Sequence, residues 1–332
     1  MYIMNDFTLI PFNNIVKFGQ TTMLEQPLFN VSWILGRFCN YSCSYCWPYA
    51  NSNVPDHQDF EVYTNAIDEI KRQARENGFT DFHFSFSGGE PTAYKKFGDL
   101  VEYYANDNEA KYQSIHLTTN LSPGEKWWAR FINNTSHLTR RSITASYHAE
   151  FANEKDFEDR CLQLMEGGVF VTINQVMVPE HFEEYYERCS RFADKGINVT
   201  LKPQSDPTAS RIVDGYTNEQ IDKLQTGFPQ NWNGEQIMQM YLEDAKGNDY
   251  GLDQAERMNA FNFNKFKDWH CNAGYQSCII RGDEVKRAYS CSDIPLGTLQ
   301  GGFKLFKTPS KCVTSSCVSS ADSKIPKVLH ES

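Results

Sequence analysis

Three cysteines fall within the segment CNYSCSYC, residues 39–46, which follows the apolar run VSWIL of residues 31–35. Their spacing is Cys-x3-Cys-x2-Cys. Three thiolates this close on one loop can hold three corners of a single soft-metal centre. A structural zinc site needs four ligands, and the nearest further candidates are Asp56 and His57, outside the segment. The triplet therefore favours an iron–sulfur cluster with one open iron; a zinc knuckle and a chance grouping are the alternatives.

The chain around this segment alternates between strand-like and helix-like patterns from residue 31 to residue 204. Strands are predicted at 31–35, 82–86, 114–120, 142–147, 170–178 and 198–202, and helices at 61–76, 95–106, 124–133, 155–166 and 180–195. Helices between consecutive strands imply parallel pairing and right-handed crossovers. An open sheet and a curved partial barrel both satisfy this pattern, and in either one the functional residues gather at the C-terminal ends of the strands.

A second motif, Ser87-Gly88-Gly89-Glu90-Pro91-Thr92, stands at the end of the predicted strand 82–86. Two glycines at a strand end allow the backbone to approach a ligand closely. Glu90 and the exposed carbonyl groups beside it can accept hydrogen bonds from an ammonium group. Alone, Gly-Gly-Glu-Pro is most often a tight turn. It becomes specific because it ends the strand that follows the cysteine segment.

Together the two motifs resemble those of the radical S-adenosylmethionine (SAM) enzymes, over roughly residues 30–205. The resemblance implies a [4Fe–4S] cluster on Cys39, Cys43 and Cys46, with SAM bound to the fourth iron through its amino and carboxylate groups. It also implies that residues 88–91 (Gly88, Gly89, Glu90 and Pro91) receive the SAM amino group and that Tyr45 lies near the adenine. In this family, one electron from the cluster cleaves SAM to a 5′-deoxyadenosyl radical, which abstracts a substrate hydrogen.

The later strand ends carry less specific candidates. The resemblance suggests Asn120, Ser146 and Asn174 for the ribose and carboxylate of SAM. Lys202, Gln204 and His148 are weak candidates for a catalytic role, and ordinary loop hydrogen bonding is the alternative for each. The family's Gly-x-Ile-x-Gly-x-x-Glu pattern is not evident. Cys161 and Cys189 share helix faces with apolar residues, which predicts buried core positions.

Five further cysteines stand in the last 62 residues. Cys271 precedes a predicted hairpin of residues 277–281 and 285–291, Cys291 ends it, and Cys312 and Cys317 follow. These four suit a tetrathiolate site, with Cys278 as a possible fifth candidate or replacement; zinc would satisfy the spacing equally well. The segment resembles the Twitch domain, a short relative of the SPASM domain, which implies one auxiliary [4Fe–4S] cluster.

The predicted fold is therefore α/β: a (β/α)6 partial TIM-like barrel followed by a small Twitch-like domain of β-hairpin and helix. The predicted division is an N-terminal extension (1–30), a radical SAM partial barrel (31–205), a helical linker (206–267) and an auxiliary-cluster domain (268–332). Within the linker, Thr217 and Gln220 form a helix-capping pattern.

Composition limits the partners. The 332 residues carry a net charge of −10 with no run of basic residues, which disfavours nucleic acid, and no long apolar stretch predicts a membrane span. The N-terminus lacks a secretory signal pattern, so a cytoplasmic location is expected. The predicted function is SAM-dependent radical oxidation or modification of a small molecule, with a flavodoxin- or ferredoxin-type electron donor. A peptide- or protein-modifying maturase is the alternative, and a non-catalytic metal-stabilised binding protein is a remote one.

Overall fold

The computed structural model describes residues 12–22, 27–107, 109–209, 211–231, 238–252, 263–291 and 295–329. It divides into two compact units. The parallel unit comprises Trp33–Thr64 and His83–Asn233, and the antiparallel unit comprises Met1–Ser32, Asn65–Phe82 and Gly234–Ser332. Among the described residues, no helix is long and apolar enough to cross a membrane.

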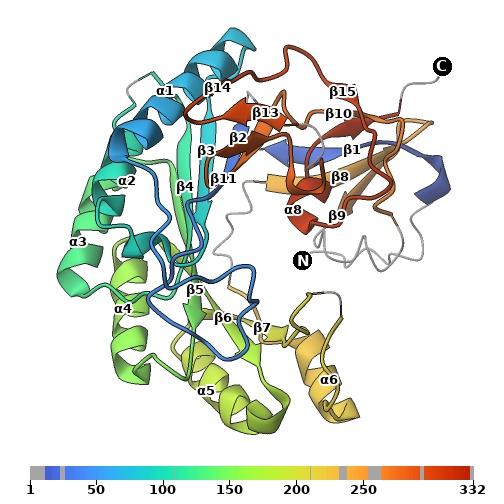
Figure 1. Cartoon of the computed structure of the whole chain (residues 1–332). Helices are drawn as coiled ribbons and strands as arrows, with labels where there is room; N and C mark the ends of the chain where they lie inside the picture. The colour runs from blue at the N-terminus through green and yellow to red at the C-terminus, as the bar shows by residue number, and fades with distance from the viewer. Residues whose placement is uncertain are drawn as a thin grey trace. The chain divides into compact units, whose positions relative to one another are not determined.

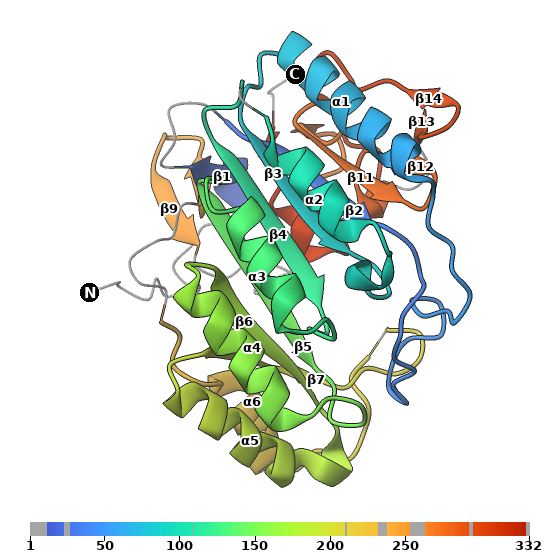
Figure 2. The same cartoon turned by 90° about the vertical axis from the view of Figure 1, so that its left-hand side faces the viewer.

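The parallel unit is a sheet with helices on one face (Figure 1, Figure 2). Its strands run in the order β3 (Phe82–Ser87), β4 (Gln113–Thr119), β5 (Arg140–Tyr147), β6 (Phe170–Met177) and β7 (Asn198–Pro203). The pairs β4–β5, β5–β6 and β6–β7 are parallel. The connecting helices are α2 (Phe97–Ala105), α3 (Glu125–Asn134), α4 (Glu154–Glu166) and α5 (Phe182–Asp194). Helix α1 (Phe60–Glu76) follows β2 (Phe29–Ile34) in the chain.

The strands alternate between apolar and polar residues, and this alternation separates the two faces of the sheet. Most of the buried positions are apolar, and they include Phe84, Phe86, Ile115, Leu117, Ile143, Val171 and Ile173. Figure 2 shows α2–α5 lying over one face of β4–β7. Apolar burial beneath helices is what holds such a layer together, at roughly 25 cal/mol per Å² of apolar surface removed from water.

The α/β fold class predicted from the sequence is confirmed, and the predicted strands and helices agree with the structure to within about two residues at most ends. The described strands do not form a closed barrel, because β7 ends their order and has only β6 as its neighbour among them. The predicted helix start at Thr217 is also confirmed: α6 (Asn218–Thr226) begins with a capping box between Thr217 and Gln220.

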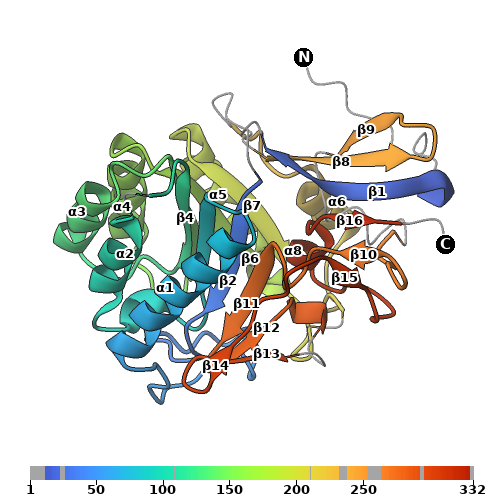
Figure 3. The same ribbon diagram turned by 90° about the horizontal axis from the view of Figure 1, so that it is seen from above.

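The antiparallel unit contains a sheet built from both ends of the chain, in the order β15-β10-β16-β1-β8-β9. Figure 3 shows β1 (Ile15–Thr22) beside β8 (Met238–Asp244) and β16 (Lys327–Val328). The remaining strands are β9 (Asp249–Leu252), β10 (His270–Cys271) and β15 (Ser310–Lys311). A second antiparallel set comprises β11 (Ser277–Arg281), β12 (Glu284–Lys286), β13 (Pro295–Thr298) and β14 (Gly302–Phe303). Helix α8 (Ser320–Ser323) is one turn long.

This unit differs from the predicted division of the chain. The predicted N-terminal extension supplies β1, and the predicted helical linker supplies strands β8 and β9, while its one described helix, α6, belongs to the parallel unit. Residues 1–11 and 23–26 of the predicted extension, and 210, 232–237 and 253–262 of the predicted linker, lie outside the described residues. The second hairpin arm is also shorter than predicted, because β12 ends at Lys286 and a 3-10 turn covers Tyr289–Cys291.

Candidate functional site

The cysteine triplet lies in the parallel unit, on the long loop between β2 and α1. Cys43 is buried, Cys39 is half-buried and Cys46 is exposed, and all three are free thiols. Burial raises the pKa of each thiol, that of Cys43 to about 12, and the neighbouring Glu150 and the other two cysteines add to this rise at Cys43. The three sulfur groups therefore lie within electrostatic reach of one another.

The donor set of the loop, three cysteine thiols, fits an iron–sulfur cluster. Among the described residues, no three His, Cys, Asp or Glu side chains are grouped closely enough to hold one metal ion. In a [4Fe–4S] cluster each cysteine binds a different iron, so its sulfurs stand farther apart than the ligands of one zinc ion. Three neighbouring thiols on one loop are the donor set that such a cluster with one open iron requires.

The loop that carries the triplet is closed on itself by backbone hydrogen bonds. The Asp56 carboxylate accepts hydrogen bonds from the backbone N–H of Arg37 at 2.8 Å and of Phe38 at 3.1 Å. Ser52 donates to the Arg37 carbonyl at 2.8 Å and accepts from Cys39 N at 3.0 Å. Charge-assisted bonds to a carboxylate are the stronger kind, so Asp56 fixes the chain just before Cys39.

The two glycines of the second motif are required by this loop. Gly88 has φ +141°, and a Cβ atom at Gly89 would lie 2.2 Å from the Phe38 carbonyl oxygen. Gly89 N donates to Gly36 O at 2.9 Å, and Glu90 N donates to Phe38 O at 2.8 Å. The absence of side chains lets the end of β3 pack directly against the backbone that leads to Cys39.

The Glu90 carboxylate is fully engaged inside the protein and is 2% exposed. It accepts hydrogen bonds from the backbone N–H and hydroxyl of Thr92, the hydroxyl of Thr119 and the backbone N–H of Asn120. Burial raises its pKa, and these hydrogen bonds oppose the rise. Glu90 therefore ties the end of β3 to the end of β4, and the ammonium acceptors that remain in the motif are backbone carbonyl groups. Pro91, also buried, begins the following 3-10 turn.

Residues after β5 hold the other side of the cysteine loop. The Glu150 carboxylate accepts hydrogen bonds from Ser44 N at 2.9 Å and Ser44 Oγ at 2.5 Å. The Tyr45 hydroxyl lies 2.9 Å from His148 Nδ1, and the two rings stack with centroids 6.0 Å apart. Burial lowers the pKa of His148 to about 4, so the ring is neutral near pH 7. His148 thus anchors Tyr45.

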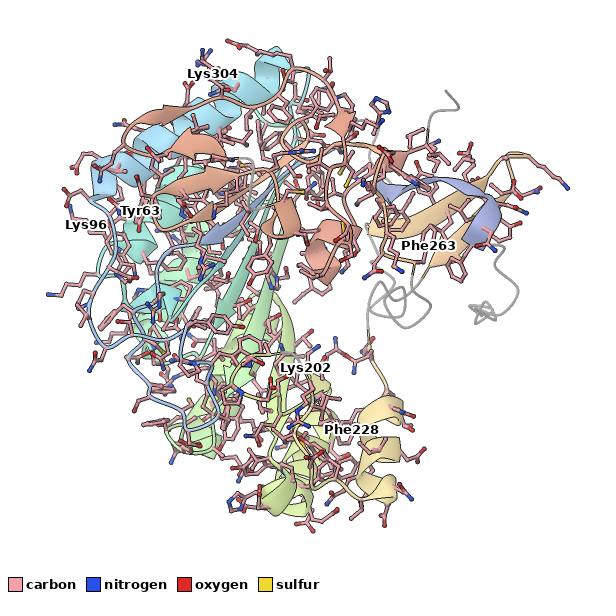
Figure 4. The ribbon with its side chains drawn as sticks, turned by 45° about the vertical axis from the view of Figure 1, so that its right-hand side comes forward. Tyr63, Lys96, Lys202, Phe228, Phe263 and Lys304 are labelled. Atoms are coloured by element: carbon pink, nitrogen blue, oxygen red, sulfur yellow. The ribbon has the colours of Figure 1, made fainter. Side chains whose placement is uncertain are left out.

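The other predicted residues are distributed around the strand ends. Asn120 donates from Nδ2 to Asn40 Oδ1 at 2.9 Å, which attaches it to the cysteine loop. Ser146 and Asn174 are register partners on β5 and β6 and are half-buried. Lys202 is exposed on β7, where Figure 4 labels it, and Gln204 follows that strand, its backbone N–H donating to the Tyr216 hydroxyl at 2.7 Å.

Sequence reasoning missed the polar face of the sheet. Its half-buried positions are His83, Ser85, His116, Thr118, Ser142, Thr144, Ser146, Thr172, Asn174 and Thr200. His116 Nδ1 lies 2.8 Å from Ser142 Oγ, and His83 Nδ1 lies 2.7 Å from Ser114 Oγ. Burial lowers the pKa of His83 to about 3, and the nearby His116 and Arg140 add to this effect. Parallel sheets are normally apolar on both faces, so the polar alternation within these strands was the available signal.

The antiparallel unit gathers four of the five tail cysteines. Cys271, Cys291, Cys312 and Cys317 are each at most 5% exposed and belong to one core with Phe18, Phe266 and Trp269. Phe263, labelled in Figure 4, packs against that core. Burial raises the pKa of Cys291 to about 11 and that of Cys317 to about 12. The charges of Cys271 and Cys312 add to the rise in both pKa values.

Cys278 differs from these four. Burial alone raises its pKa to about 12, with no contribution from another cysteine. It lies within β11, one residue after the strand begins. The four other cysteines are therefore the neighbours of one another, and Cys278 is a core residue of the second strand set. Cys161 and Cys189 are fully buried on α4 and α5, as predicted.

Comparisons with known proteins agree with this geometry. The family described as "Radical SAM superfamily" matches residues 33–203, just over half of the chain. No curated protein matches. A solved structure described as "Native anSMEcpe with bound AdoMet" is 18% identical, with a TM-score of 0.55 over 85% of this chain and 81% of that one. A second, "Native anSMEcpe with bound AdoMet and Cp18Cys peptide", is 15% identical, with a TM-score of 0.53 over 83% and 79%. These likenesses show the fold, and the matched family shows that the chain belongs to the radical SAM superfamily.

Proposed function

We propose that this chain cleaves SAM reductively and uses the radical to abstract hydrogen from a small polar molecule, in a net oxidation or modification. The observation that carries the proposal is the convergence of two features in one unit. The cysteine loop is fixed at the C-terminal ends of β3 and β4, and the polar face of the same sheet leads to those ends. Ligands of parallel α/β sheets bind at that edge.

The chain's own residues then have distinct parts. Cys39, Cys43 and Cys46 hold three irons of the cluster, which supplies the electron for SAM cleavage when it is bound. Asp56 and Glu150 fix the loop from opposite ends. Glu90 holds the ends of β3 and β4 together, so that backbone carbonyls beside it can accept from the SAM amino group. The Tyr45 ring, held by His148, remains the candidate neighbour of the adenine.

The chemistry of the polar face supports a hydrogen-bonding substrate. Strands β3–β7 contain no aspartate or glutamate, and their polar face presents hydroxyl and amide groups and the neutral imidazole of His83. The charged side chains on these strands are cationic: Arg140, Arg141 and Lys202. Ser146 on β5 and Asn174 on β6 are register partners. They remain the candidates for binding the ribose or carboxylate of SAM. Lys202 and Gln204 remain the candidates for substrate contact. A neutral or anionic polar molecule fits this lining, because a cationic one would find no counter-charge on it.

The antiparallel unit supports a second, auxiliary [4Fe–4S] cluster held by Cys271, Cys291, Cys312 and Cys317. These side chains come from separate segments and meet in one core, which is how a closed four-cysteine site is built. Four protein ligands leave no open iron, so the chemical part of this cluster is electron transfer. A flavodoxin- or ferredoxin-type protein in the cytoplasm would supply the first electron.

A peptide substrate is the second candidate. It is favoured by the fold likeness to the structure that holds a Cp18Cys peptide. The two candidates differ in a simple assay: the true substrate class increases 5′-deoxyadenosine formation and is itself changed. Small polar metabolites are expected to do so. If only peptides increase 5′-deoxyadenosine formation, the small-molecule proposal is wrong and the peptide-modifying maturase is favoured.

Iron analysis tests the clusters directly. Anaerobic reconstitution is expected to give about eight irons per chain, from two clusters of about four. Replacing Cys39, Cys43 and Cys46 by alanine should leave about four irons and reduce 5′-deoxyadenosine to background. About four irons with one zinc in the unaltered chain would contradict the proposed auxiliary cluster. Reductive SAM cleavage by the triple variant would show that the triplet is not the active centre, and metal binding without any SAM cleavage in the unaltered chain would favour a binding protein.

A further inference from the structure

Two cationic side chains are buried completely beside the tail cysteines. Arg287 is 2% exposed and Lys327 is 0% exposed. Among the described residues, neither forms an ion pair with a carboxylate. Burying an unpaired charge costs several kcal/mol (order of magnitude) unless another charge compensates it. No described carboxylate therefore neutralises either cation by a direct ion pair.

Arg287 has unused hydrogen-bonding capacity. Its Nε donates to the Ala273 carbonyl at 3.2 Å, and its guanidinium lies 5.2 Å from the centre of the Phe306 ring. Its Nη2 is buried and has no hydrogen-bond partner in the described part of the chain. Its charge interacts electrostatically with Cys291. The guanidinium thus lies in a buried site, within electrostatic reach of one of the four cysteines.

Lys327 is held in place by the backbone around α8. Its Nζ donates to the carbonyls of Asp322 at 2.8 Å, Ser323 at 3.2 Å and Ile325 at 2.6 Å. It also lies over two aromatic rings, 4.7 Å from the centre of Phe266 and 5.5 Å from that of Phe18. Its charge interacts with Cys317, so the two cations act on different cysteines of the same group.

One buried carboxylate offsets part of this charge. Asp322 is 6% exposed, accepts hydrogen bonds from the backbone N–H of Tyr289 and Ser290, and interacts electrostatically with Cys291 and Cys317. Among the described residues, two buried cations and one buried anion leave one positive charge around the four cysteines. A [4Fe–4S] cluster on four thiolates carries a net charge of about −2 when oxidised and about −3 when reduced.

We propose that Arg287 and Lys327 are positioning residues that set the reduction potential of the auxiliary cluster, holding it high enough to accept an electron. Positive charge in a low-dielectric site stabilises the more negative, reduced form. Two sulfur hydrogen bonds act in the same sense: Ala273 N donates to Cys271 Sγ at 3.5 Å, and the Thr314 hydroxyl lies 3.4 Å from Cys312 Sγ. This inference rests on the proposed four-cysteine cluster.

The test is a potentiometric titration of the tail cluster in the full-length chain, with Cys39, Cys43 and Cys46 replaced by alanine so that one cluster remains. Arg287→Met and Lys327→Met should each make reduction less favourable by at least tenfold, which is about 59 mV for one electron. Arg287→Lys and Lys327→Arg keep the charge and should retain most of the potential. Lys311→Met is the matched control, because Lys311 adjoins Cys312 but its side chain is 62% exposed.

Each outcome decides the question. If Arg287→Met and Lys327→Met shift the reduction potential no more than Lys311→Met does, the inference is wrong, although the cluster itself is present. If the Met variants lose iron but Arg287→Lys and Lys327→Arg keep it, the charges are needed to load the cluster and not to set its potential, and the inference fails. If the charge-keeping variants lose iron as well, the two residues serve packing alone and the inference fails. Absence of about four tail irons in the unaltered chain would instead overturn the proposed cluster.

Discussion

The two cysteine groups of this protein are held in opposite ways. The triplet occupies eight consecutive residues on a partly exposed loop, and carboxylates of Asp56 and Glu150 fix that loop by accepting its backbone N–H groups. The tail group is spread over residues 271–317, is almost completely buried, and has buried cations beside it. An exposed loop with acidic anchors suits a centre that must admit SAM and substrate. A buried, cation-flanked group suits a centre that exchanges only electrons.

Removing tail cysteines should separate the two groups most clearly. Cys312→Ala with Cys317→Ala is expected to abolish product while the triplet still forms some uncoupled 5′-deoxyadenosine, because the first cluster is built without the tail. Iron should fall from about eight to about four per chain. Product, 5′-deoxyadenosine and iron are the measurements.

Cys278→Ala is the matched control for that experiment, since Cys278 is equally buried but has no cysteine neighbour acting on it. It should keep about eight irons and its product. Loss of the tail iron in Cys278→Ala, or full product formation by the folded double variant, would contradict the four-cysteine assignment.

Phe18→Ala should destabilise the core that holds the tail cysteines, although Phe18 lies near the N-terminus of the sequence. Phe18 is 1% exposed on β1, stacks on Phe266 with centroids 5.9 Å apart, and belongs to the core of the tail cysteines. Truncating a buried phenylalanine costs about 3–5 kcal/mol. Denaturant unfolding should show that loss, with iron released from the tail before the triplet.

Leu329→Ala, at a side chain that is 37% exposed in the same unit, should cost about 0.5 kcal/mol or less. Equal destabilisation by the two substitutions would mean that β1 is not part of the core that holds the tail cysteines.

Gly89→Ala should disturb the triplet and spare the tail. A Cβ atom there would lie 2.2 Å from Phe38 O and 2.3 Å from Arg37 O, so backbone must move. Overpacking of this kind costs about 1–3 kcal/mol, and SAM cleavage should fall while tail iron remains. Gly124→Ala meets no atom within 4 Å at φ −74° and should behave as the unaltered chain. Full SAM cleavage by Gly89→Ala would show that the loop can shift without loss.

Glu150→Ala should have the smallest effect. It removes the acceptor for Ser44 N and Oγ at an exposed position, and such bonds contribute about 0.5–1.5 kcal/mol. The loop should loosen, and the rate of SAM cleavage should fall up to about tenfold. Asp159→Ala, which removes only a pairing with Lys155 on the surface of α4, provides the comparison. Equal rates of SAM cleavage in the two variants would show that Glu150 does not hold the cysteine loop in place.

The sequence by itself determined the parallel unit. Its strands and helices are local patterns of period 2 and 3.6, and the residues between Val31 and Gln204 that set each pattern are neighbours in the chain. The triplet could be recognised for the same reason, because its three cysteines are consecutive members of one loop. Gly88 and Gly89 were recognisable as a motif from the sequence. The reason why glycine is required there is the close approach of the backbone of residues 36–38, and only the folded structure shows it.

Only the tertiary structure decided the antiparallel unit. Four of its described strands, β10, β14, β15 and β16, are only two residues long. Strand β1 pairs with β8 and β16 across more than 200 and 300 residues, a pairing that no local period encodes. Separation of Cys278 from the other four cysteines, and burial of Arg287 and Lys327 beside them, are likewise products of packing. Hydrogen-bond pairing and burial are satisfied by whichever segments meet in space, so residues far apart in the chain acquire a shared function only in the folded protein.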